Sequence, residues 1–358
     1  MSVVPAVVKR AELGQLADPV AGQSGESVGI WRTGNGLLFK EYKETAVLNG
    51  RPEALAHLVA IGRGEAPVYR ADRAALLAAT SWPAARVIDA QGNLVGCLIP
   101  EAGKKFRSDA GKLREIDTLA QTDARLAAQG LPISRDQRIS VCRGIAAVAA
   151  ALERYGLVYS DWNYANALWC PDDGSAFIID VDGCRAEKMP NICQSGWEDP
   201  LTSTGTPADM YTDRFRVALL VARCLTGERH LIGVLHALSS AGDQLIPGRE
   251  NLLDMLWAED RSARPSLAIL RAALGGAGVR FPVARRPLPA LPARAAATAH
   301  ASKIRPSKLT SPASPADQKQ AGPVPPAPQR TSAVLFTVLL SIAVLIAVAV
   351  GIIVGLHH

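Results

Sequence analysis

The spacing of hydrophobic residues changes near residue 105, which predicts two structurally different regions. Before it, β-prone residues surround glycine-containing turns in residues 28–40, VGIWRTGNGLLFK, and in residues 85–103, ARVIDAQGNLVGCLIPEAG. Each segment predicts two antiparallel strands joined by a tight turn, at TGNG and at AQGN. Between them, residues 51–62 carry apolar residues at helical spacing behind Pro52, so we expect one helix there.

Beyond residue 105 the apolar spacing becomes helical. Residues 134–156 begin at the N-cap candidate Ser134, repeat apolar side chains with a helical period and end at Gly156. Two further helices are predicted over residues 213–227 and 266–276, and the apolar run Ala176–Ile179 predicts a strand. The pattern therefore predicts an α+β chain with a β-rich region followed by a helical region.

The end of the chain has the pattern of a membrane span. From Ala333 to Leu356 it holds 24 residues without a charge, and a helix rising ~1.5 Å per residue would cross the ~30 Å hydrocarbon core over that length. Residues 276–332 are rich in proline and alanine, which predicts a disordered linker. Arg330 beside the span favours a cytoplasmic position for the N-terminal bulk, and MSVVPAVVKR lacks the apolar run of a secretory signal.

Charge and cysteine usage narrow the classes of function. The net charge is +6, but residues 281–332 hold eight basic residues and one acidic residue, a balance of +7, so the rest sums to −1. We therefore expect no nucleic-acid-binding surface on the folded region. The six cysteines form no Cys-x-x-Cys pair and the histidines do not cluster. This favours reduced, mostly buried thiols and no histidine or cysteine metal site.

A short serine-hydrolase-like motif near the N-terminus lacks the expected context. GESVG, Gly25–Gly29, fits the nucleophile elbow of serine hydrolases, which requires a helix directly after the serine. The strand-like segment IWRTGNGLLF follows instead. Ser27 is therefore not expected to be a nucleophile.

The segment YSDWNYANALW, residues 159–169, carries a stronger signal for chemistry. An aspartate at a helix-to-loop junction, here Asp161, can accept the proton of an attacking hydroxyl, and Asn166 five positions later can bring its amide oxygen to a cation held with phosphates. Magnesium takes one or two protein carboxylates and fills its other positions with water and phosphate. Asp180, at the end of the predicted strand, is the candidate carboxylate, with Asp182 as an alternative.

The order of these features resembles the protein kinase family, in the divergent form found in bacteria. The resemblance rests on the Asp161–Asn166 loop and the strand ending in Asp180, together with five further segments: GQSGESVG, LLFK, CLIPEAG, TDRFRVALLVARCLTGERH and WAEDRSARPSLAIL. It implies a two-lobed kinase-like fold over residues 1–275, with an N-lobe at about 15–103 and a C-lobe at about 104–275.

The resemblance also implies roles for single residues. Lys40, with Lys43 as second choice, would bind ATP phosphates, Asp161 would be the catalytic base, and Mg²⁺ or Mn²⁺ would lie on Asn166 with Asp180 or Asp182. The other implied nucleotide-site residues are Gly22, Gly25 and Val28 in the glycine-rich segment, Ile99 to Ala102 with Glu101 at the adenine, Leu168, and Glu53 as a helix partner for Lys40. Asp213 would bond to the catalytic-loop backbone, and Arg264 would pair with Glu198.

Departures from the family pattern leave three functions open. Asn163 stands where the family carries a lysine on the γ-phosphate, Tyr159-Ser160 replaces His-Arg, and Asp180-Val181-Asp182 replaces Asp-Phe-Gly. The leading hypothesis is a membrane-anchored serine/threonine kinase that uses ATP and phosphorylates proteins. A pseudokinase scaffold is the alternative. A small-molecule phosphotransferase of the aminoglycoside or choline kinase kind is the third, although it leaves ARPS and TDRF unexplained.

Overall fold

The computed structural model describes residues 4–290, apart from positions 17–18, 24, 45–50, 67–68, 132, 187–188, 204 and 243–244. All of these residues lie in one structural unit, Met1–Ala296. Within the described ranges, no helix combines the length and the apolar character needed to cross a membrane. The predicted membrane span at 333–356, and the predicted linker beyond residue 290, lie outside the described residues.

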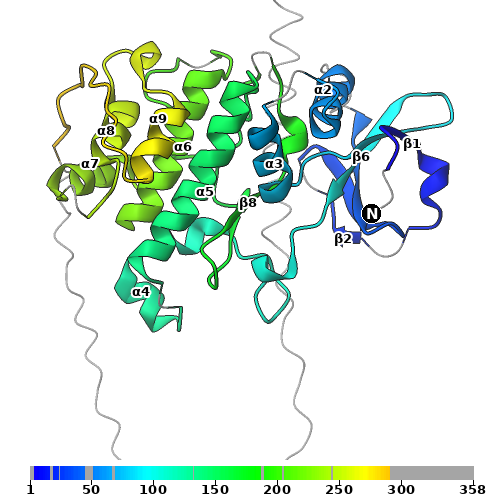
Figure 1. Cartoon of the computed structure of the whole chain (residues 1–358), viewed down its shortest axis with the longest axis horizontal. Helices are drawn as coiled ribbons and strands as arrows, with labels where there is room; N and C mark the ends of the chain where they lie inside the picture. The colour runs from blue at the N-terminus through cyan, green and yellow to red at the C-terminus, as the bar shows by residue number, and fades with distance from the viewer. Residues whose placement is uncertain are drawn as a thin grey trace, which may run out of the picture. The chain divides into compact units, whose positions relative to one another are not determined.

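A six-stranded sheet forms the first part of the fold, in the order β1-β5-β6-β4-β3-β2 (Figure 1). Its strands are β1 Val7–Lys9, β2 Pro19–Ala21, β3 Ser27–Arg32, β4 Leu37–Tyr42, β5 Ala85–Ile88 and β6 Leu94–Pro100. Neighbouring strands are antiparallel except β1 and β5, which are parallel. The predicted hairpins β3–β4 and β5–β6 are confirmed, while β1 starts the sheet well before residue 15.

Helices α2, Arg51–Arg63, and α3, Arg70–Ala79, follow β4. Leu55 of α2 is fully buried and belongs to one hydrophobic cluster with Tyr42 of β4 and Ile99 of β6, so α2 is held against the sheet. Trp82, after α3, donates its indole N–H to the carbonyl of Leu58 at 2.9 Å. The helix predicted at 51–62 is confirmed, and α3 was not predicted.

The second part of the fold is helical, with one small hairpin. Its elements are α4 Asp123–Ala128, α5 Arg135–Arg154, β7 Ala167–Trp169, β8 Ala176–Ile178, α6 Met210–Thr226, α7 Leu231–Ser240, α8 Arg249–Trp257 and α9 Leu267–Leu274. Helix α5 begins as predicted: Ser134 Oγ accepts from Gln137 N at 3.1 Å, and Gln137 Oε1 accepts from Ser134 N at 2.9 Å. The α+β class, with a sheet first and helices after it, is confirmed.

Helix α6 begins three residues before the predicted start at Asp213. Its N-cap is Asp209, whose carboxylate accepts from the backbone N–H groups of Tyr211 and Thr212. Asp213 therefore lies inside the first turn, where its side chain is buried and points to another segment.

The sheet and the helices are joined through β8. Ser81 N donates to the carbonyl of Ile178 at 2.9 Å, and Thr80 forms a parallel bridge with the same residue. Leu58 of α2 and Leu76 of α3 belong to the main hydrophobic cluster, together with buried residues of α5 and α6. The residues that follow β8 are thereby fixed relative to the sheet.

The chain stays in contact with the helices beyond the linker boundary expected at residue 276. Arg285 forms ion pairs with Asp254 and Glu250 of α8, at 2.6 and 2.8 Å, and Trp257 donates its indole N–H to the carbonyl of Pro287 at 2.9 Å. An arginine guanidinium can bind a carboxylate with two parallel hydrogen bonds. An arginine-rich segment can therefore pack on the folded region, so its composition alone does not show that it is a linker. The expected start of the linker was too early.

Gly96 in β6 tests how tightly the sheet holds Lys40. A Cβ at Gly96 would lie 2.2 Å from the carbonyl oxygen of Lys40 and 2.6 Å from the ring of Phe39. We expect Gly96→Ala to lower the free energy of unfolding by about 1–3 kcal/mol, because β4 and β6 must separate. Gly34→Ala, in the β3–β4 turn with open space around it, should change it by less than ~0.5 kcal/mol. Equal stability of the two variants in urea unfolding would contradict this packing.

Candidate active site

Lys40 lies on β4 with its ammonium buried between two carboxylates. Its Nζ is 2.8 Å from Asp182 Oδ1 and 3.2 Å from Asp180 Oδ1, and its side chain is only 8% exposed. Burial disfavours the charged form, but the charges of Asp182 and Asp180 outweigh it and raise the pKa of Lys40 above its ordinary value. The ammonium is therefore charged at neutral pH.

Asp182 is the fully buried centre of a charge cluster. Besides Lys40, its carboxylate accepts from the hydroxyl of Tyr42 at 2.8 Å and from Arg51 Nη1 at 3.1 Å. Burial acts against ionisation, but the charges of Lys40 and Arg51 hold the pKa of Asp182 below its ordinary value. Asp182 is thus an internal counter-ion for two cations, which differs from the metal-ligand role considered for it.

Asp180 is placed differently, at the edge of this cluster. Its side chain is 43% exposed and makes its contact to Lys40 through Oδ1. Its backbone is left-handed, with φ 58°, and Ser160 has φ 59°; they are the only non-glycine residues with positive φ in the described ranges. Such conformations are costly for residues with a side chain and concentrate at functional sites. Asp180 is itself a predicted metal ligand, and Ser160 directly precedes the predicted catalytic base, Asp161.

The loop after α5 binds the carboxylate of Asp161 with two amides. Asp161 Oδ1 accepts from Asn163 Nδ2 at 2.7 Å, and Asp161 Oδ2 accepts from Asn166 Nδ2 at 2.6 Å. Asn163 Oδ1 in turn accepts from the backbone N–H groups of Ala165 and Asn166. Asn163 therefore holds the loop together through hydrogen bonds. Its side chain is neutral, whereas the family pattern has a lysine at this position.

Helix α6 holds this loop through the side chain of Asp213. The two carboxylate oxygens of Asp213 accept from the backbone N–H groups of Tyr159 and Ser160, each at 2.8 Å. Burial raises the pKa of Asp213 to about 7, while these two hydrogen bonds oppose the rise. The predicted contact between Asp213 and the loop backbone is confirmed. Arg216, one turn later on α6, donates to the carbonyl of Ser160 and to Asn191 Oδ1.

The surroundings of Asp161 suit a proton acceptor. The residue is open to solvent, yet the neighbouring protein desolvates its carboxylate and raises its pKa. The amides of Asn166 and Asn163 act in the opposite direction, and the charge of Asp180 adds to the rise. A carboxylate with a raised pKa is a stronger base than an ordinary aspartate and still ionises.

The helix glutamate expected as the partner of Lys40 is not its partner. Glu53 is exposed on the first turn of α2 and makes no ion pair among the described residues. Lys40 forms its ion pairs with Asp182 and Asp180 instead. Lys43, the second choice for the phosphate-binding lysine, donates to the carbonyl of Gly25 at 2.8 Å.

The glycine-rich segment is the connection between β2 and β3. Gly22 and Gly25 are exposed in it, and a Cβ on either would meet no atom within 4 Å. Val28, on β3, is 45% exposed. Glu26, beside Gly25, reaches across to α2 and pairs with Arg51.

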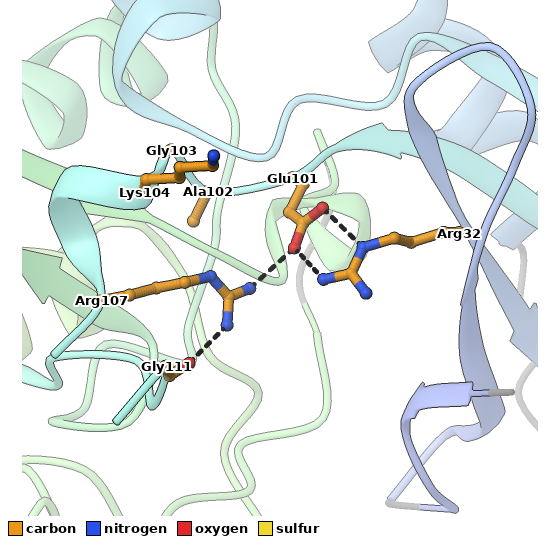
Figure 2. Close-up of a pocket in the computed structure, with 7 residues that line it drawn as sticks. All are labelled: Arg32, Glu101, Ala102, Gly103, Lys104, Arg107 and Gly111. Carbon is orange, nitrogen blue, oxygen red and sulfur yellow. Dashed lines mark hydrogen bonds and ion pairs between the residues drawn. The ribbon is translucent and has the colours of Figure 1, made fainter. Parts of the chain in front are cut away.

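A pocket of about 540 Å³ opens at the residues after β6 (Figure 2). Glu101 forms ion pairs there with Arg32 of β3 and with Arg107, each at 2.8 Å, and the hydrogen bond and charge of Arg32 lower its pKa. Of the residues predicted near adenine, Glu101 and Ala102 line this pocket. Ile99, on β6, is buried in the cluster with Leu55 of α2.

Leu168 connects the pocket after β6 to the loop of Asp161. It is fully buried on β7 and clusters with Phe106, Phe177 and Cys170, and Ala102 packs on the same cluster. The backbone N–H of Ile179 donates to the carbonyl of Asn166 at 3.0 Å. The predicted residues Leu168, Asn166 and Asp180 are therefore carried by one short hairpin.

The predicted ion pair of Arg264 has a different partner. Arg264 binds Asp199, with both oxygens at 2.6 Å and both side chains fully buried. Glu198 instead accepts from the backbone N–H of Gly196 at 2.7 Å. The charge and hydrogen bonds of Arg264 hold the pKa of Asp199 below its ordinary value, against the effect of burial.

The ionisable residues of the described part of the chain form no metal-binding cluster of their own. No group of three or more histidine, cysteine, aspartate or glutamate side chains there is arranged to hold a metal ion. All six cysteines are free, and all except Cys193 are buried, as predicted for the thiols.

Comparison with known proteins assigns no family. No protein-family model matches the sequence, and no curated protein matches it significantly.

Three contributors to the site were not predicted: Tyr42, Arg51 and Arg216. Tyr42 carried a usable signal, since it lies two residues after Lys40 on a strand and so shares its face. Arg51 and Arg216 carried none, because charged residues on a helix are exposed in most proteins.

The Arg264–Asp199 pair provides a stability test. Removing one partner of a buried ion pair leaves an uncompensated charge, so we expect Asp199→Ala to lower the free energy of unfolding by about 3–5 kcal/mol. Glu198→Ala, the adjacent residue and the predicted partner, should cost less than ~1 kcal/mol. Urea unfolding of both variants measures the difference, and a larger cost for Glu198→Ala would contradict the assignment.

Proposed function

We propose that the chain is an ATP-dependent phosphotransferase with a protein-kinase-type fold, which moves the γ-phosphoryl group to serine or threonine hydroxyls of proteins. The observation that supports it most is that Lys40 contacts Asp180, whose charge in turn acts on Asp161 in the Asp161–Asn166 loop. The functional assignment rests on these groups and their chemistry.

Nucleotide binding is assigned to the sheet side of the cleft. The charged ammonium of Lys40 binds the α- and β-phosphates, and the exposed backbone at Gly22 and Gly25 approaches them without side-chain obstruction. The adenine is assigned to the pocket lined by Glu101 and Ala102, and Leu168 lies buried in the cluster on which Ala102 packs.

The donor set fits a magnesium or manganese ion held by few protein ligands. Asp180 offers an exposed carboxylate whose Oδ2 accepts no hydrogen bond from the described residues, and no described residue donates to Asn166 Oδ1. Asp182 is excluded from this role because Lys40, Tyr42 and Arg51 surround it. When bound, the ion neutralises charge on the phosphates.

The transfer step assigns the proton to Asp161. The acceptor hydroxyl gives its proton to the Asp161 carboxylate while its oxygen forms a bond to the γ-phosphorus. The bond between that phosphorus and the β–γ bridging oxygen breaks, and the bridging oxygen leaves with the electron pair as part of ADP. Asn163 and Asn166 hold the carboxylate in place during the step.

A pseudokinase is the second candidate, and one observation favours it. The position of Asn163 supplies no positive charge to the γ-phosphate, and both oxygens of Asp161 already accept amide hydrogen bonds. In that case the cleft binds a nucleotide without transferring its phosphate. The predicted membrane span would place either activity at the cytoplasmic side of a membrane.

Replacement of Asp161 separates the two candidates. The full chain, purified in detergent, is incubated with γ-labelled ATP, Mg²⁺ or Mn²⁺ and a generic protein acceptor. We expect Asp161→Asn to lower label transfer by roughly 10²- to 10⁴-fold, because the proton acceptor is lost. Asp172→Asn, an exposed aspartate in the β7–β8 turn, is the matched control and should keep wild-type transfer. Nucleotide binding without transfer by the wild type would favour the pseudokinase.

The raised pKa of Asp161 can be observed directly. Because burial is the largest cause, its titration should lie above the ordinary aspartate value of ~3.9. The active base is the ionised form, so its population falls as pH decreases through this raised pKa. The side-chain amide signals of Asn163 and Asn166, in ¹⁵N-asparagine-labelled protein, report the titration because both amides donate to Asp161. A midpoint at or below ~3.9 would contradict the description of the site.

A further inference from the structure

Arg51 is a buried cation beside Lys40 that the proposed chemistry leaves unused. Its side chain is only 3% exposed, its guanidinium lies 4.6 Å from the centre of the Tyr42 ring, and its Nη1 donates to Asp182 at 3.1 Å. Two cations, Lys40 and Arg51, therefore share the single fully buried carboxylate of Asp182. The cluster is one negative charge short of neutrality in its buried part.

Two partly exposed carboxylates supply further negative charge: Asp180 contacts Lys40, and Glu26 of the glycine-rich segment contacts Arg51. Glu26 pairs with the other terminal nitrogen of Arg51, Nη2, although the Glu26 side chain is 61% exposed. The base of the segment is fixed by Lys43, whose backbone N–H donates to the carbonyl of Glu26 at 2.9 Å and whose ammonium donates to that of Gly25. The carboxylate of Glu26 thus reaches Arg51 from the solvent side.

The two carboxylates on Arg51 differ in how easily they leave. Asp182 has no exposure and has three partners, so its removal from Arg51 disrupts the cluster. Glu26 can return to water while Arg51 keeps its bond to Asp182 and its contact with the Tyr42 ring, because most of the Glu26 side chain is already exposed. Departure of Glu26 leaves on Arg51 a pair of donors that suits another oxyanion, because the planar guanidinium binds carboxylate and phosphate oxygens with similar geometry.

We propose that Arg51 is a second phosphate-binding residue of the nucleotide site, and that Glu26 occupies it until a polyphosphate displaces the Glu26 carboxylate. The inference rests on the proposed function, because it assumes that Lys40 binds phosphates. Arg51, on α2, would then supply a positive charge to the phosphates. The neutral side chain of Asn163 supplies none. The glycine-rich segment then changes partner when the nucleotide binds.

Titration calorimetry tests this exchange. It measures the affinity of the full chain, purified in detergent, for inorganic tripolyphosphate in the absence of a divalent cation. We expect Glu26→Gln to tighten binding by roughly 2- to 5-fold, the factor that corresponds to losing a partly exposed competing ion pair. Glu41→Gln, the same change on β4 without contact to Arg51, should leave the affinity unchanged. Arg51→Met should weaken binding by roughly tenfold or more and should abolish the effect of Glu26→Gln in the double variant.

Circular dichroism establishes that each variant is folded, and Arg51→Lys replaces Arg51→Met if the latter does not fold. Lysine keeps the charge but loses the fork, so it should also weaken binding and reduce the effect of Glu26→Gln. If the wild type binds tripolyphosphate and the two residues act independently, the exchange is refuted while the proposed function stands. If the wild type binds neither tripolyphosphate nor ATP, both are refuted.

Discussion

The arrangement of the site depends on the buried charge cluster around Asp182. Its carboxylate comes from the segment after β8, Lys40 and Tyr42 come from β4, and Arg51 comes from α2. A buried ion is stable only when its partners are all present, so these three elements must come together as a unit. Asp180 is two residues from Asp182 and touches Lys40, and Ile179 is hydrogen-bonded to the Asp161–Asn166 loop. The cluster therefore sets the position of the sheet relative to the loop on which the proposed chemistry depends, and a change in α2 would be felt at Lys40.

Positive charge is distributed unevenly over the candidate site. The loop beside Asp161 is organised by neutral amides, and the positive charge is concentrated on the sheet side, at Lys40 and Arg51. Transfer of a phosphoryl group depends on neutralising the charge of the phosphates. In the proposed reaction that task is assigned to Lys40, Arg51 and a divalent cation, and the proton is assigned to Asp161. Ser160 and Asp180 both have a left-handed backbone, a strained conformation that persists only where the surrounding structure holds it.

The parts of the fold that could be predicted are those with a local signal. The β3–β4 and β5–β6 hairpins follow from turn residues between β-prone runs, and α5 follows from its cap and its apolar period. Strands β1 and β2 have three residues each, too few to show an alternation, and were missed. Among the predicted site residues, the structure brings Lys40 into contact with Asp180 and Asn166 into contact with Asp161, as their order along the chain led us to expect. The other partners could not be predicted, because Glu53 and Glu198 were chosen by sequence position, whereas Asp182 and Asp199 are selected by burial and by the direction of each side chain. The charged start of α2 gave no sign that Arg51 is buried.

The central claim is that Lys40, Asp180 and Asn166 hold a metal–nucleotide complex facing Asp161. A crystal structure of the chain with Mn²⁺ and a non-hydrolysable ATP analogue tests it most directly, since anomalous scattering locates the metal. We expect a manganese peak bonded to a carboxylate oxygen of Asp180 and to Asn166 Oδ1, with phosphate oxygens on Lys40. A cleft without nucleotide at saturating concentration, or a metal bonded to Asp182 in place of Lys40, would contradict it.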